Sequence, residues 1–120
     1  MNKTAVVKAL NGIGIGYGVF ALAAPRMMQR VYGIAETTPE LRQMTRLWGT
    51  TLLSMSIMSA AAGDEGQDSR LLAVGLGNAI AGIAELVAAA TDGLPVKAAI
   101  PGAVTSAAVA GSCIWARSLD

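Results

Sequence analysis

Long apolar segments, separated by short charged stretches, dominate this chain and restrict what it can fold into. The four segments are Val6–Ala24, Leu47–Ala62, Leu71–Ala90 and Ala98–Ala116. Together they contain only two charged residues, Lys8 and Glu85. An α-helix needs about 20 residues to cross the ~30 Å hydrocarbon layer of a membrane, and the second and fourth segments reach that length when extended back by two residues. The pattern therefore predicts four membrane-spanning helices.

The composition favours a membrane protein over a soluble one. Charged residues make up 14% of the chain, against about 25% in soluble domains. A soluble Ala-rich four-helix bundle is the alternative, but its helices would carry polar outer faces that these segments lack. Lys and Arg number 9 and Asp and Glu number 8, so their charges nearly cancel. The chain therefore has no strong positive electrostatic potential that would attract nucleic acid.

Helix boundaries can be placed from local signals. Thr4 is a candidate N-cap for the first helix. Thr38, Pro39 and Glu40 form a stronger start signal: a capping hydroxyl, a proline at the first helical position and an acidic side chain at the positive end of the helix dipole. We expect one integral membrane domain over residues 1–120 with helices at about 5–24, 39–62, 70–90 and 95–116. The fold class is all-α, a four-transmembrane-helix bundle with both termini on the same side.

Glycine occupies every second position in the run NGIGIGYGVF at the start of the first segment. On a helix, Gly12 and Gly16 share one face, and Gly14 and Gly18 share the opposite face. Small residues let membrane helices approach closely, so both faces are candidate helix-packing or partner interfaces. A phosphate-binding loop would need G-x-G-x-x-G spacing after a strand, and Tyr17 stands where the third glycine would be.

The third segment carries one stripe of small and polar residues at three- and four-residue steps. Its members are Leu71, Gly75, Asn78, Gly82, Glu85 and Ala89. Gly75 and Gly82 extend the predicted packing interface. Asn78 and Glu85 form a possible intramembrane polar site, because an ionised group at the bilayer centre costs roughly 2.5–3.5 kcal/mol. Two interpretations of Glu85 remain open. It is either a proton or ligand site, or the partner in an interhelical hydrogen bond, with Asn78, Thr50, Ser54 or Thr105 as its neighbour.

Nothing in the sequence assembles a catalytic or metal site. The chain has no histidine, which is the commonest general base and metal ligand. Cys113 is the single cysteine, so cysteine clusters are excluded. Glu85 has no second acid, base or nucleophile within reach by spacing. We predict no catalytic residue, no metal, no cofactor and no enzymatic activity.

The first loop, Pro25–Ile34, alternates apolar and polar residues in a way that suits the lipid headgroup zone. Arg26 and Arg30 are the candidate contacts to lipid phosphates. The alternative is a solvated loop that leads into the second helix.

Several short motifs carry a resemblance that covers most of the chain. The glycine-rich span ends in AAPR, VYGI follows five residues later, and TPELR leads into RLWG. This arrangement resembles small four-helix membrane proteins of unknown function related to the DoxX-like group, which have no agreed catalytic residues. The size and Ala/Gly-rich character also resemble actinobacterial accessory subunits of Mce-type lipid importers.

Two functions follow as expectations. The first is a non-catalytic accessory subunit of a larger membrane complex, in contact with membrane lipids and part of an Mce-type lipid-transport machine in the bacterial inner membrane. No nucleic acid and no soluble substrate are expected as partners. The alternative is a small transporter or a lipid- or quinone-binding protein that uses the Asn78–Glu85 face as an oligomer.

Overall fold

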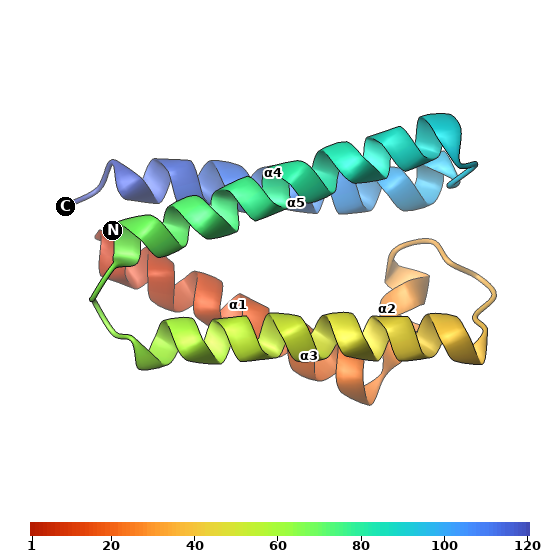
Figure 1. The fold of residues 1–120 in the computed structure, drawn as a ribbon, viewed down its shortest axis with the longest axis horizontal. Helices are drawn as coiled ribbons and strands as arrows, with labels where there is room; N and C mark the ends of the chain where they lie inside the picture. The colour runs from red at the N-terminus through yellow and green to blue at the C-terminus, as the bar shows by residue number, and fades with distance from the viewer. The chain divides into compact units, whose positions relative to one another are not determined.

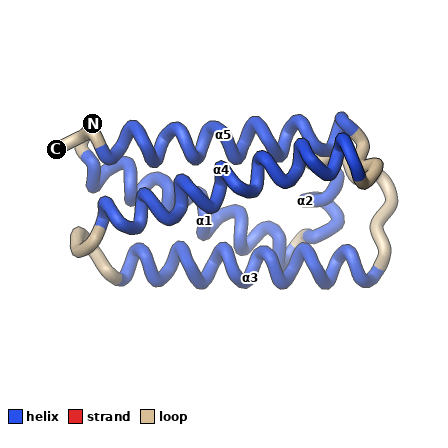
Figure 2. Tube along the Cα trace, turned by 45° about the horizontal axis from the view of Figure 1, so that its top comes forward, coloured by secondary structure: helices blue, strands red, loops and turns tan.

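The computed structural model describes residues 1–120 as helices joined by short loops, with no strand (Figure 2). The five helices are α1 (Lys3–Ala23), α2 (Pro25–Val31), α3 (Pro39–Ala61), α4 (Gln67–Thr91) and α5 (Val96–Arg117). The all-α prediction is confirmed. The short helix α2 occupies the loop that the sequence marks as amphipathic, and it buries Met28 and Gln29 while Arg26 and Arg30 are exposed.

Three helices, not four, are long and apolar enough to cross a membrane: α1, α4 and α5. The expected second span, α3, does not meet this criterion. It begins at Pro39 and therefore includes the charged side chains Glu40, Arg42 and Arg46. Its apolar part is also interrupted by hydroxyl residues, which lower its mean hydropathy. The members are Thr50, Thr51, Ser54, Ser56 and Ser59.

The chain divides into two compact units, which are described separately. One unit joins Met1–Val7 to Gly66–Asp120, and the other is Lys8–Glu65. Helix α1 belongs to both, because the division falls within it.

In the first unit, α4 and α5 form an antiparallel helical hairpin (Figure 1). Its connection contains Gly93, whose φ of +73° is a left-handed conformation that side chains other than glycine rarely adopt. Pro95 then opens α5, and its carbonyl accepts the backbone N–H groups of Ala98 and Ala99 at 2.8 and 3.0 Å. This turn chemistry reverses the chain within a few residues.

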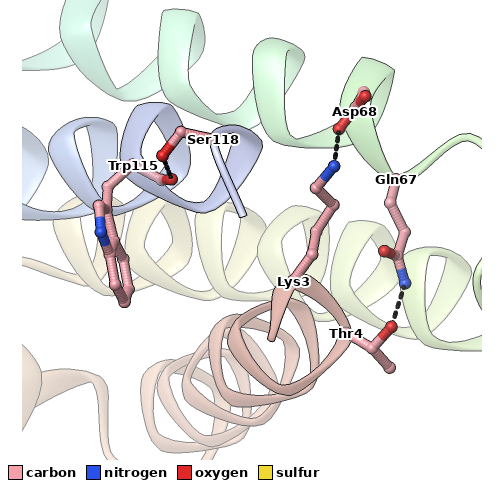
Figure 3. A network of polar contacts seen from close by, with 6 residues as sticks. All are labelled: Lys3, Thr4, Gln67, Asp68, Trp115 and Ser118. Atoms are coloured by element: carbon pink, nitrogen blue, oxygen red, sulfur yellow. Dashed lines mark hydrogen bonds and ion pairs between the residues drawn. The ribbon is translucent and has the colours of Figure 1, made fainter. Parts of the chain in front are cut away.

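The N-terminal residues are tied to the start of α4 (Figure 3). The Lys3 ammonium lies 3.0 Å from the Asp68 carboxylate, and the Gln67 amide donates a hydrogen bond of 3.2 Å to the Thr4 hydroxyl. The backbone N–H of Lys3 also donates to the Asp120 carbonyl, at 3.3 Å. Residues from the two ends of the chain therefore meet at the end of the hairpin where α4 begins and α5 finishes.

In the second unit, α2 is held against α3. The buried Gln29 side chain donates a hydrogen bond of 2.7 Å to the Thr45 hydroxyl. The predicted start of α3 is confirmed, because the Thr38 hydroxyl accepts the backbone N–H of Leu41 at 3.2 Å. Capping of this kind satisfies one of the free N–H groups in the first turn.

Candidate functional site

The buried glycine face of α1 packs against α3. A Cβ atom added at Gly14 would overlap the Ser56 hydroxyl. At Gly18 it would lie 2.8 Å from Leu53 Cβ and 2.9 Å from the Gly49 carbonyl oxygen, closer than real Cβ atoms come. The two backbones therefore approach to a distance that only glycine permits on α1. The sequence indicates Gly14 and Gly18, but not which residues of α3 they meet.

The opposite face of α1 is open within the unit Lys8–Glu65. Gly12 and Gly16 are exposed, and a Cβ atom added at either would have nothing within 4 Å. Ile13 and Val19 nearby are also about half exposed. Close packing therefore needs glycine at two of the four alternating positions, and the space at the other two is unused.

The small and polar stripe of α4 forms the seam of the α4–α5 hairpin. A Cβ atom at Gly75 would lie 3.1 Å from Cys113 Cβ, and one at Gly82 would lie 3.2 Å from Ser106 Cβ. Leu71 is buried at one end of the same stripe. Small side chains opposite each other let the helix backbones come close, as in membrane helix pairs generally. The fully buried Cys113 thiol is part of this seam.

Asn78 and Glu85 lie on this seam but do not bond to each other. The Asn78 amide nitrogen donates to the Val74 carbonyl one turn earlier on α4, at 2.9 Å. The Thr105 hydroxyl on α5 donates to the Pro101 carbonyl at 2.8 Å. The hydrogen bonds from these side chains therefore stay within their own helices.

The Glu85 carboxylate lies over the backbone of Gly102 on α5. A Cβ atom at Gly102 would overlap Glu85 Oε2 and lie 2.7 Å from Oε1. Oε2 is buried and has no hydrogen-bond partner. The carboxylate thus fills the space left by the missing side chain of Gly102. Its position is unusual, because buried polar atoms are normally satisfied.

The two arginines of α2 point into solvent rather than into the fold, since both are exposed. Arg30 also lines an open hollow together with Gly33, Ile34 and Ala35. An exposed guanidinium beside a shallow hollow is suited to contact a phosphate. Arg26 and Arg30 remain predicted headgroup contacts.

Sequence reasoning did not find the polar cluster at the N-terminal end of α4. Thr4 and Gln67 are 63 positions apart. The predicted N-cap role of Thr4 is wrong, because α1 already begins at Lys3 and the backbone N–H of Ala5 donates to the Asn2 side-chain oxygen at 2.9 Å. Nowhere do three or more Cys, Asp or Glu side chains gather to hold a metal ion. Comparison with protein-family models, with curated proteins and with solved structures gives no match to this chain.

Proposed function

We propose that this protein is a non-catalytic accessory subunit that crosses the membrane four times and packs against helices of a larger membrane complex. The observation that carries the proposal is the contrast between the two glycine faces of α1. Gly14 and Gly18 are occupied by α3, whereas nothing lies within 4 Å of the Cβ positions of Gly12 and Gly16. In lipid, helix association depends on close packing, so a bare glycine face is suited to another helix.

Contacts at the start of α4 support α3 as the fourth span. Lys3 and Asp68 pair across the starts of α1 and α4, so the two helices begin on the same side of the membrane. If α1 crosses the layer, it ends on the opposite side. The chain must then return before α4 begins, and α3 is the only helix between them long enough to do so, at about 34 Å for 23 residues.

Hydrogen bonding within α3 reduces the cost of placing it in lipid. The hydroxyls of Thr50 and Thr51 donate to the carbonyls of Arg46 and Leu47, each at 3.0 Å. Hydroxyls satisfied by the helix backbone are cheaper in hydrocarbon than unbonded ones. The bond from Lys3 to Asp120 supports both termini on the same side.

The lipid-transport part of the proposal rests on the size and Ala/Gly-rich character that resemble accessory subunits of Mce-type lipid importers. We propose a bacterial inner membrane as the compartment and an Mce-type lipid importer as the complex. Arg26 and Arg30 would then contact lipid phosphates at the membrane surface.

Extraction of native membranes in mild detergent tests the accessory role. We expect the chain to travel in a particle well above its own mass of 12.2 kDa, together with a larger membrane protein. A lone monomer that neither self-associates nor retains a partner would contradict the proposal.

A second function has one observation in its favour. The unpartnered Glu85 oxygen is compatible with a small transporter, or with a lipid- or quinone-binding protein, that uses the Asn78–Glu85 face as an oligomer. Glu85→Gln discriminates between the two functions. Loss of transport in a variant that still assembles would favour the transporter, and an unchanged phenotype would eliminate it.

A further inference from the structure

Glu85 lies in a setting that an ionised carboxylate does not tolerate well. It belongs to a helix apolar enough to span a membrane, and it lies six residues before that helix ends at Thr91. Oε2 is buried without a hydrogen-bond partner. A carboxylate removed from water without compensation is strongly disfavoured, and such a group becomes neutral by taking up a proton.

No positive charge in the hairpin compensates Glu85. The charged residues of α4 are Asp68, Arg70 and Glu85, and those of α5 are Lys97 and Arg117. Lys97 is the cation nearest to Gly102 along α5, but it is exposed and forms no ion pair with Glu85. The titratable Cys113 thiol lies further along the seam, beside Gly75.

Gly102 provides the space that holds the carboxyl group. Any larger residue would place its Cβ atom where the Glu85 oxygens lie. The pairing of a carboxyl on one helix with a glycine on the facing helix therefore shields Oε2 between two backbones, while the Glu85 side chain as a whole is half-buried. Gly102 is buried, whereas Gly77 and Gly111, on the same two helices, are exposed with nothing within 4 Å.

From this geometry we propose that Glu85 is a proton-binding site within the membrane, held as the neutral acid over Gly102 and able to exchange its proton with water. The ligand is a proton, not a metal cation, because the structure supplies no second oxygen-rich side chain beside Glu85. Water reaches the group from the Thr91–Pro95 end of the hairpin, which is the nearer end. Loss of the proton requires hydration, so it loosens this end of the α4–α5 seam.

Labelling with an apolar carbodiimide tests the site directly in the full chain in lipid vesicles. The neutral acid gives its proton to a carbodiimide nitrogen, and its oxygen attacks the central carbon. Rearrangement leaves an N-acylurea, so the chain gains one whole reagent molecule and nothing leaves. We expect peptide mass spectrometry to find this adduct at Glu85 and not at the exposed Glu36 or Glu40. Its rate should fall along one titration curve as the pH rises.

Matched variants separate the site from general reactivity. Glu85→Gln should remove the adduct and should leave the assembled complex intact, which keeps this inference separate from the accessory role. Gly102→Ala should lower the pH at which half of the labelling is lost, because the displaced carboxyl gains water. Gly77→Ala, at an open glycine of α4, should leave that pH unchanged.

Three results would overturn the proposal. The first is labelling of Glu85 no faster than that of the exposed acids, and the second is protection of Glu85 from labelling by sodium but not by choline at equal ionic strength. The third is the same pH of half-labelling in the Gly102→Ala and Gly77→Ala variants. If Gly102→Ala fails to fold, infrared spectroscopy of the wild type provides a second measurement. It should show a protonated carboxyl band that disappears in Glu85→Gln, and absence of that band contradicts the site.

Discussion

Gly18 of α1 and Gly49 of α3 lie against each other, each close to the backbone of the other helix. A Cβ atom at Gly18 would be 2.9 Å from the Gly49 carbonyl oxygen, and one at Gly49 would be 3.0 Å from the Gly18 carbonyl oxygen. A Cβ atom at Gly49 would also lie 2.7 Å from Ala21 Cβ. Neither backbone can yield as a flexible side chain would, so both positions need glycine.

We therefore expect Gly49→Ala to destabilise the fold by about 1–3 kcal/mol, the usual cost of overpacking a close contact. Reversible unfolding in mixed detergent micelles, followed by circular dichroism, measures this change. Gly16→Ala is the matched control, because its Cβ atom meets nothing within 4 Å. Equal unfolding midpoints for the two variants would show that the helices do not approach at Gly49.

The α4–α5 seam predicts the reactivity of the single thiol. Cys113 is fully buried beside Gly75, so a membrane-permeant maleimide should modify it slowly in the folded protein. Gly75→Leu forces the helices apart and should cost about 1–3 kcal/mol of stability. The population of molecules in which the seam is open rises about ten-fold for every 1.4 kcal/mol lost. Gly77→Leu adds the same side chain to the open face and should leave the rate near that of the wild type. A similar acceleration in both variants would contradict this seam.

The start of α3 predicts a specific dependence of stability on pH. A hydrogen bond from the backbone N–H of Glu40, and then one from the Thr38 side chain, hold the pKa of the exposed Glu40 carboxyl below its ordinary value. A carboxyl with a lowered pKa in the folded state stabilises the fold above its unfolded pKa, and this contribution is lost as the pH falls through the folded pKa. Glu40 lies outside the apolar part of α3, so solvent protons reach it.

Glu40→Gln should therefore flatten the acid limb of the curve that relates unfolding midpoint to pH. Thr38→Ala should flatten it in part, and it should also cost about 1 kcal/mol because the N-cap is lost. Thr38→Ser retains the hydroxyl and serves as the control. An acid limb that is the same in the wild type and in Glu40→Gln would exclude this carboxylate as its source.

Membrane topology separates four crossings from three. Single cysteines at Asn2, Asp92 and Leu119, each in a Cys113→Ser background, can be labelled with an impermeant maleimide in sealed vesicles. We expect Asn2→Cys and Leu119→Cys to react from the same side and Asp92→Cys from the other. If α3 lay on the surface, only α1, α4 and α5 would cross. Asn2→Cys and Asp92→Cys would then share a side, with Leu119→Cys opposite.

The sequence predicts those features that depend on neighbours along the chain. The all-α fold class follows from the long apolar segments. The start of α3 follows from Thr38 and Pro39, because N-caps and first-turn prolines act locally. The stripe of α4 is also visible in the sequence, because residues three and four apart share a helix face. The helix α3 is less apolar than α1, α4 and α5, because Arg46 and several hydroxyl residues lie within its C-terminal 18 residues.

Features that depend on which helices meet could not be predicted. Gly12, Gly14, Gly16 and Gly18 look equivalent in the sequence, and only the position of α3 distinguishes the packed pair from the open pair. Glu85 could be identified as an acid within an apolar segment, but its placement over Gly102 depends on the register of the α4–α5 hairpin. A shift of that register would change the residue opposite Glu85 without altering any local pattern.

The partner role of the open α1 face is the central claim, and the mass of the native particle tests it most directly. We expect a Gly12→Leu, Gly16→Leu double variant, extracted in mild detergent, to fall from the mass of the complex to that of the free chain. Its unfolding midpoint should stay near that of the wild type, and the control Gly77→Leu should retain the complex. A double variant that keeps the full particle mass would contradict the account. So would a double variant whose monomer loses stability, because the Gly12–Gly16 face would then be covered within the chain itself.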